Sequence, residues 1–234
     1  MPHHPVNPAH SGRRQFLQTA LTGAALGVVA RAGFEFVAPW TVFAQTKLSP
    51  EQALQELLAG NQRYVAGQLT STKQDPAALR AKTAAKQEPF AAVLACADSR
   101  VPVELVFDQS IGQIFVTRVA GNIVTPEIIG SLEFAVAVVG VRVLLVLGHS
   151  SCGAVKAAMK GDAAPGQISS LYPHLRGAVE KSGGDLAKAI EANAQIQADL
   201  LRTSSPVIRD AVKEGTLKVV AGVYDLASGK VALS

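Results

Sequence analysis

The sequence predicts a single α/β domain whose mainly parallel central sheet is flanked by helices. Short, continuous apolar runs such as 90–95 and 142–147 are typical of strands that are buried on both faces. These runs alternate with segments of helical pattern, as expected for strand–helix–strand units. The chain has 234 residues, 48% of them hydrophobic, which is enough for one sizeable core. No internal repeat or low-complexity linker divides it.

The first expected helix has a clear start signal. Ser49 has the features of an N-cap, because Pro50 takes the first helical position and Gln52 completes a capping box. We expect this helix to end at Gly60-Asn61. Its apolar face, separated from the core strands by a polar stretch over 70–88, suits packing against a partner subunit. That face consists of Leu54, Leu57 and Leu58.

The remaining elements follow in chain order. Apolar continuity predicts the strands, and apolar periodicity predicts the helices. The expected strands are 90–95, 114–119 and 142–147, with a closing hairpin of 217–224 and 230–233 around Ser228-Gly229. The expected helices are 76–85, a buried helix over 126–139, one from Gly153 to Lys160, and mostly helical sequence from there to Glu214.

The N-terminal segment resembles a twin-arginine export signal. Arg13-Arg14 precede Phe-Leu and a mildly apolar run over 19–30, and Val-Phe-Ala at 42–44 offers a small-residue cleavage site. The run is shorter than the ~20 residues of a membrane span, so we expect no stable membrane anchor. Residues 1–44 are therefore expected to be a signal peptide and 45–234 an exported, periplasmic or secreted domain. The alternative is a disordered or amphipathic tail.

The composition restricts the chemistry available to this domain. The formal charge is +4, and no clustered basic stripe of the kind that binds nucleic acid is present, so no nucleic-acid partner is expected. The chain holds two cysteines and five histidines, and three of the histidines precede Arg13. Soft-ligand chemistry in the mature domain must therefore use Cys96, Cys152, His149 and His174.

Three of these four residues stand where a metal site would form. Cys96 follows the first expected strand, and His149 and Cys152 follow the third. Ligand sites in open parallel sheets lie beyond the carboxyl ends of the strands. Two thiolates and one imidazole fit one tetrahedral zinc ion per chain, with an open catalytic position. Alternatively, the two cysteines are buried small residues or a disulfide, but the His-x-x-Cys spacing favours metal.

Asp98 and Arg100 accompany the first cysteine. Being two residues apart in extended backbone, they can point the same way and pair. A lone surface pair of this kind contributes almost nothing to stability. Beside a metal-bound water, however, Asp98 would accept a hydrogen bond while Arg100 kept it ionised and aimed.

These motifs resemble the β-carbonic anhydrase family. The resemblance rests on Cys96-x-Asp98-Ser99-Arg100-Val101-Pro102, on the Gly-His-Ser-Ser-Cys-Gly segment over 148–153, and on flanking similarity from 60–64 to 223–225. It implies the fold of that family and a zinc enzyme that reversibly hydrates carbon dioxide to bicarbonate and a proton through zinc-bound hydroxide. It also implies a homodimer or a larger homo-oligomer.

The resemblance further implies residue roles. Some members of the family have a regulatory bicarbonate site that includes a Trp, and Val93 stands at the position of that Trp. Arg118 and Tyr224 match the other members of the site, but without the Trp we do not expect it to form. Asp98 is therefore expected to stay paired with Arg100. The substrate-binding positions, with Gln87 near a dimer seam, are Gln87, Phe115, Ala120, Phe134 and Gly153.

Three other functions remain as alternatives. An enzyme of the same fold could hydrolyse carbonyl sulfide or carbon disulfide, which are also linear and apolar. A non-catalytic zinc or redox module would use the same ligands. A serine hydrolase elbow at Gly148-His149-Ser150 is disfavoured because Cys152 takes the place of its second glycine. His174 matches no motif and is expected on a helix surface.

Overall fold

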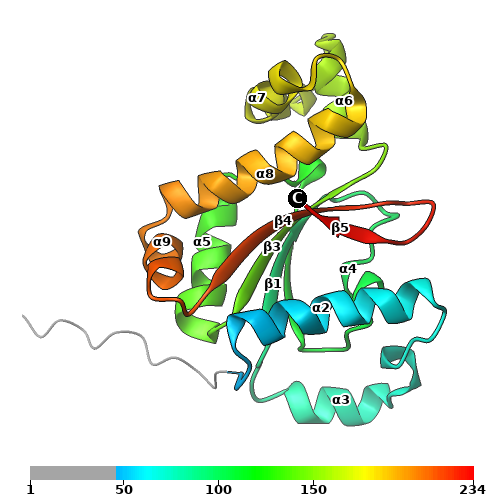
Figure 1. The fold of residues 1–234 in the computed structure, drawn as a ribbon, viewed down its shortest axis with the longest axis vertical. Coiled ribbons are helices and arrows are strands. Elements are labelled where there is room, and N and C mark those ends of the chain that lie inside the picture. Colours follow the sequence, from blue (N-terminus) through cyan, green and yellow to red (C-terminus); the bar gives the residue numbers. More distant parts are fainter. Residues whose placement is uncertain (1–45) are drawn as a thin grey trace, which may run out of the picture. The chain divides into compact units, whose positions relative to one another are not determined.

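Five strands form one sheet in the order β2-β1-β3-β4-β5 (Figure 1). The computed structural model describes residues 46–234. β1 to β4 are parallel, and β5 runs antiparallel to β4. This arrangement confirms the predicted fold class and the predicted strands to within about two residues. The strands are β1 Ala91–Ala95, β2 Ile114–Arg118, β3 Val143–His149, β4 Lys218–Tyr224 and β5 Val231–Leu233.

Helices cover both faces of the sheet (Figure 1). In the described part of the chain, none of them is long and apolar enough to cross a membrane. The expected signal peptide lies outside the described residues. The α-helices are α2 Pro50–Val65, α3 Pro76–Thr83, α4 Val103–Val106, α5 Pro126–Phe134, α6 Gly153–Lys160, α7 Tyr172–Ser182, α8 Leu186–Ser204 and α9 Pro206–Lys213. The shorter helical turns are η1 Ser71–Lys73, η2 Ala120–Asn122, η3 Ala135–Val139 and η4 Ile168–Leu171.

The two central strands send alternate side chains into two separate cores. In β1, Val93 packs with α2 and α4, whereas Leu94 packs with α5, α8 and α9. A third cluster lies beneath the carboxyl end of the sheet and contains Cys96 and Cys152. Strands buried on both faces read as continuous apolar runs, which is why the sequence located them well.

The leucine face of α2 belongs to the first core. Leu54 and Leu57 are buried against the sheet of their own chain, and Leu58 packs partly against the same cluster. The expectation that this face packs on a partner subunit was therefore wrong. The polar stretch after α2 contains α3, which has no buried residue. This stretch does not separate α2 from the sheet.

The start of α2 was predicted correctly and its end was not. Ser49 and Gln52 form the expected capping box, but the helix continues through Gly60 and Asn61 to Val65. Gly60 lies inside this helix, and only glycine fits there because a Cβ would lie 1.8 Å from the carbonyl oxygen of Phe107. Asn61 is buried, and its side chain bonds the backbone at three places instead of breaking the helix.

The helix expected over 126–139 forms, but it is only half buried. α5 continues into the π-helical turn η3, and Leu132 and Ala135 face the second core. Phe134, between these two residues, has 43% of its surface exposed. The apolar composition of this segment predicted a fully buried helix and gave no sign of its exposed face.

Asp108 closes the loop between α2 and α3. It is 3% exposed and accepts hydrogen bonds from Arg63 at 2.6 Å and from the backbone N–H groups of Thr70 and Ser71. Burial raises the pKa of Asp108, but the Arg63 guanidinium and the donors at Ser71 and Thr70 outweigh it and hold the pKa well below its usual range. This carboxylate is therefore charged in the folded protein.

Candidate metal centre

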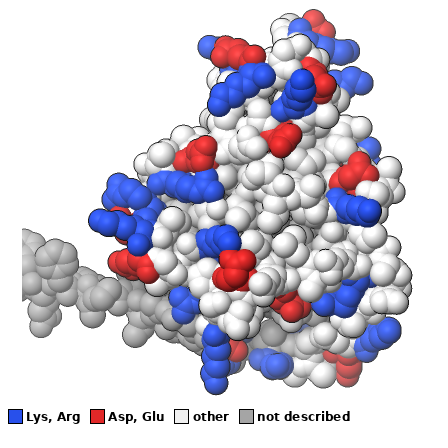
Figure 2. Space-filling model, in the orientation of Figure 1, with Lys and Arg blue, Asp and Glu red and all other residues white. Residues whose placement is uncertain are grey.

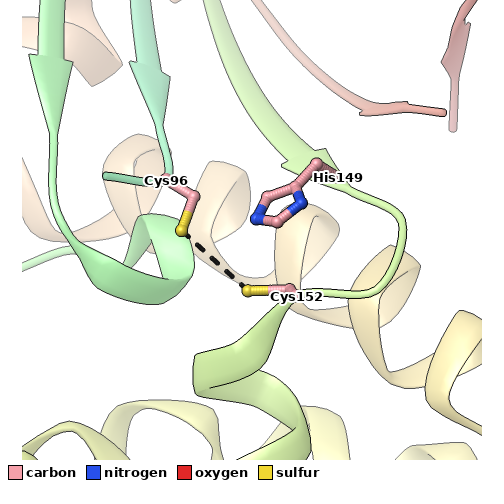
Figure 3. Close-up of side chains that lie close together, drawn as sticks. All are labelled: Cys96, His149 and Cys152. Atoms are coloured by element: carbon pink, nitrogen blue, oxygen red, sulfur yellow. Dashed lines mark hydrogen bonds between the residues drawn. The ribbon is translucent and has the colours of Figure 1, made fainter. Parts of the chain in front are cut away.

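Two adjacent strands bring the three predicted ligands together. Cys96 directly follows β1, His149 is the last residue of β3, and Cys152 caps the N-terminus of α6. Because β1 and β3 are parallel neighbours, both deliver these side chains to the same edge of the sheet. The three donor atoms lie within 4.8 Å of one another, with the two Sγ atoms 4.0 Å apart (Figure 3).

The ring of His149 is oriented to offer Nε2 to this cluster. Nδ1 lies 3.0 Å from the carbonyl oxygen of Ser150, and because a carbonyl only accepts, Nδ1 carries the proton. Nε2 then holds a free lone pair. This atom is buried and has no hydrogen-bond partner among the described residues. A buried nitrogen without a partner is costly, and a bound metal ion would account for it.

The two cysteine sulfurs share one hydrogen bond. The hydrogen bond from the Cys152 thiol lowers the pKa of Cys96 against the opposing effect of burial, and the Gly121 N–H adds to the lowering. The Gly121 nitrogen is 3.3 Å from Cys96 Sγ. The same sulfur–sulfur hydrogen bond, together with burial, raises the pKa of Cys152.

The donor set fits zinc. Two sulfurs and one imidazole nitrogen at these separations are the ligands of a tetrahedral zinc site with one position left open. The cluster is buried: His149 has no exposed surface, and Cys96 and Cys152 are at most 4% exposed. The two cysteine sulfurs and the histidine nitrogen of this cluster are therefore all suitable ligands for a zinc ion.

Asp98 and Arg100 form the expected pair beside the cluster. Arg100 Nε lies 2.9 Å from Asp98 Oδ1, and Nη2 lies 2.8 Å from Oδ2. The pairing arises from a turn, because the Arg100 N–H also bonds Oδ1 and the Val101 N–H bonds the Asp98 carbonyl, so the extended geometry we expected was wrong. Asp98 Oδ2 is 3.8 Å from His149 Nε2. The Arg100 side chain, and then its backbone N–H, hold the pKa of Asp98 well below its usual range.

Arg118 fastens the loop that carries these residues. Its Nε donates to the Cys96 carbonyl at 2.9 Å and its Nη2 to the Asp98 carbonyl at 2.5 Å. Val93 is fully buried in the core, and the Tyr224 hydroxyl lies 3.2 Å from that of Tyr64. In this chain Arg118 thus supports the ligand loop directly.

The five expected substrate positions fall into two groups. Gly153 follows the ligand Cys152, and Ala120 precedes Gly121, whose N–H lies against Cys96 Sγ. Gln87 precedes β1 while Cys96 follows it, and a five-residue strand is roughly 16 Å long. Gln87 and Phe134 line a groove of about 480 Å³, and Phe115 contacts Phe134 with ring centroids 6.5 Å apart. Within one chain this second group does not reach the ligands. His174 is exposed on α7, as expected.

Gly121 contributes to the site but was not predicted from the sequence. Its backbone N–H reaches Cys96 Sγ because the residue adopts φ +78°, which favours glycine. The available signal was a Gly-Asn pair directly after a strand, where two consecutive residues with positive φ form a tight turn.

Together, the fold and the site define an α/β protein with a two-cysteine, one-histidine metal-ligand set at the carboxyl edge of its parallel sheet. A family model described as carbonic anhydrase matches residues 91–231. A carbonic anhydrase of Mycolicibacterium smegmatis is 36% identical over 195 residues, covering 79% of this chain and 93% of the relative. The chain belongs to the carbonic anhydrase family of enzymes.

Solved structures assign the fold to the β class of this family. The β-carbonic anhydrase of Coccomyxa in complex with acetazolamide has a TM-score of 0.60 and 28% identity, over 77% of this chain and 85% of that one. Tetrameric β-carbonic anhydrases of Sordaria macrospora have a TM-score of 0.63 at 22% identity, over 77% of this chain and 95% of theirs, and support the fold alone.

Proposed function

We propose that this protein reversibly hydrates carbon dioxide to bicarbonate and a proton, using one zinc ion per chain held by Cys96, His149 and Cys152. The observation that carries the proposal is the buried cluster, in which the three donor atoms lie within 4.8 Å and His149 Nε2 has no other partner among the described residues. The family membership supports the same reaction.

The chain's own groups divide the work around this cluster. Zinc bound there would supply a Lewis acid that brings the ionisation of water close to neutral pH. Asp98 stays a carboxylate at physiological pH because its pKa is depressed, so it acts as a hydrogen-bond acceptor for the reacting water. Arg100 fixes the direction of that acceptor through two bonds, and Arg118 holds the loop backbone.

The metal assignment is tested by measuring zinc content and stopped-flow carbon dioxide hydration on the same preparation. Cys96→Ser should lose zinc and activity together, because a hydroxyl is a poor zinc ligand compared with a thiolate. Ala97→Ser, which changes an exposed neighbour and leaves the ligands in place, should retain both. Full zinc content in Cys96→Ser would contradict the ligand assignment.

Substrate preference is tested by assaying carbon dioxide, carbonyl sulfide and carbon disulfide side by side. We expect hydration of carbon dioxide to dominate. Hydrolysis of either sulfur compound with no hydration would replace the proposed reaction by that of the alternative enzyme. Tightly held zinc without turnover of any of the three would indicate a non-catalytic module.

We also propose a homodimer or larger homo-oligomer in which Gln87 of a second copy completes the substrate site. Gln87 and Phe134 are exposed at the amino end of the sheet, remote from the cluster of their own chain. The Sordaria relatives of similar fold are tetrameric. Sedimentation should show at least a dimer, and an active monomer would contradict the proposal.

Export remains a proposal on the sequence alone. Arg13-Arg14, the short apolar run and Val42-Phe43-Ala44 support cleavage after residue 44 and delivery of folded protein to the periplasm or medium. Such a route suits an enzyme that acquires its metal before it leaves the cytoplasm.

A further inference from the structure

Helix α8 buries two amide side chains in an otherwise apolar face. Asn193 and Gln197 are each 1% exposed and lie one helical turn apart, among Ala189, Ala194 and Ala198. Their amides bond each other, with Gln197 Nε2 donating to Asn193 Oδ1 at 3.0 Å. A buried amide is costly unless both its ends are hydrogen-bonded.

The other ends of these amides hold the segment that follows β2. Asn193 Nδ2 donates to the Gly121 carbonyl at 2.8 Å, and Gln197 Oε1 accepts from the Val124 N–H at 2.8 Å. Gln197 Nε2 also donates to the His174 carbonyl at 3.1 Å, which links α7 to the same network. Both amides therefore have their donor and acceptor ends in use.

Gly121 is the point at which this network meets the metal ligands. Its carbonyl is held by Asn193, and its N–H lies 3.3 Å from Cys96 Sγ. Close packing leaves it little freedom, since a Cβ at this position would lie 3.3 Å from Ala154 Cβ. The direction of the N–H toward the sulfur thus depends on the buried amides.

We propose that Asn193 and Gln197 are positioning residues for the ligand sulfur of Cys96, because they hold Gly121 so that its N–H donates to Sγ. This inference rests on the proposed metal site and adds a role for α8 in tuning it. A hydrogen bond to a thiolate withdraws electron density from the sulfur and fixes its direction. Groups that orient metal ligands in this way change metal affinity by about 10-fold to 100-fold when they are removed.

Cobalt(II) substitution gives a readout that a purely structural role would not move. In Asn193→Leu we expect the thiolate-to-cobalt charge-transfer band to shift to longer wavelength, because a sulfur without its N–H donor gives up an electron more easily. Cobalt affinity should fall by about 10-fold or more. Gln197→Leu should change both in the same direction. Gln195→Leu, an exposed position on the same helix, is the matched control and should leave both unchanged.

A second measurement needs no variant. In cadmium-113-substituted wild-type protein, the Gly121 amide proton should show scalar coupling to the metal through the N–H···S bond. Absence of this coupling would overturn the inference even if neither leucine variant folded. A folded Asn193→Leu protein with lowered melting temperature but an unchanged cobalt band and affinity would also overturn it. Failure of the wild-type protein to bind cobalt at all would instead refute the proposed metal site.

Discussion

Replacing Gly60 by alanine should destabilise the protein, although the same change stabilises an ordinary helix. Gly60 lies inside α2, where alanine is normally favoured by about 1 kcal/mol. The new Cβ would stand 1.8 Å from the Phe107 carbonyl oxygen and 2.7 Å from its carbon, roughly 1.5 Å short of ordinary contact. The obstacle is backbone, so α2 must move away from the end of α4. Overpacking of this kind costs about 3 kcal/mol, which leaves a net loss of about 2 kcal/mol.

Thermal unfolding followed by circular dichroism measures this effect. A loss of about 2 kcal/mol should lower the melting temperature by about 4–8 °C in a domain of this size. Gly177→Ala in α7 is the control, since its Cβ would meet only Ile196 Cδ1 at 3.6 Å, and it should hold or raise the melting temperature. If Gly60→Ala melts at or above the wild-type temperature, the packing argument is refuted.

Three further predictions concern charge, pH and export. Asp98→Asn should keep its zinc but slow carbon dioxide hydration by about 100-fold or more. The activity of the wild-type protein should rise with pH as a single ionisation. Loss of zinc from the variant, or a steep cooperative collapse of wild-type activity below about pH 8, would contradict the pairing of Asp98 with Arg100. The folded-state pKa of Asp108 is depressed, so its stabilisation is complete above the ordinary Asp range near pH 4 and is lost as pH falls below it; Asp108→Asn should therefore flatten the acid side of the stability curve, and an unchanged slope would contradict this. Replacing Arg13 and Arg14 by lysine should trap precursor in the cytoplasm, whereas unchanged export would point to another route or to no signal.

The sequence predicted best what depends on local pattern. Continuous apolar runs located β1 and β3, and because both are parallel and central, the ligands that follow them had to meet at one edge. The capping residues located the start of α2, because Ser49, Pro50 and Gln52 interact within one helical turn. These signals need no knowledge of distant residues.

What the sequence could not show depends on distant contacts. The Gly60-Asn61 pair is typical of a helix end, yet the helix continues through it. Gly60 packs against the Phe107 backbone, and Asn61 bonds the connection between β4 and β5. The apolar composition of α5 does not reveal that Phe134 faces outward. Asn193 and Gln197 are polar residues on a core-facing helix, and only the fold shows that their amides reach the segment around Gly121.

Asn61 ties the first described helix to residues far along the chain. Its side chain bonds the Gly229 carbonyl and the Val231 N–H, which are 168 and 170 positions further along the sequence. The amide cannot find these partners while the C-terminal hairpin is still inside the ribosome. The first described helix is thus fully anchored only after the last strand has been synthesised, and such long-range closure slows folding. Any process that acts only on the fully anchored domain therefore has to wait until residues 229–231 are available to bind Asn61.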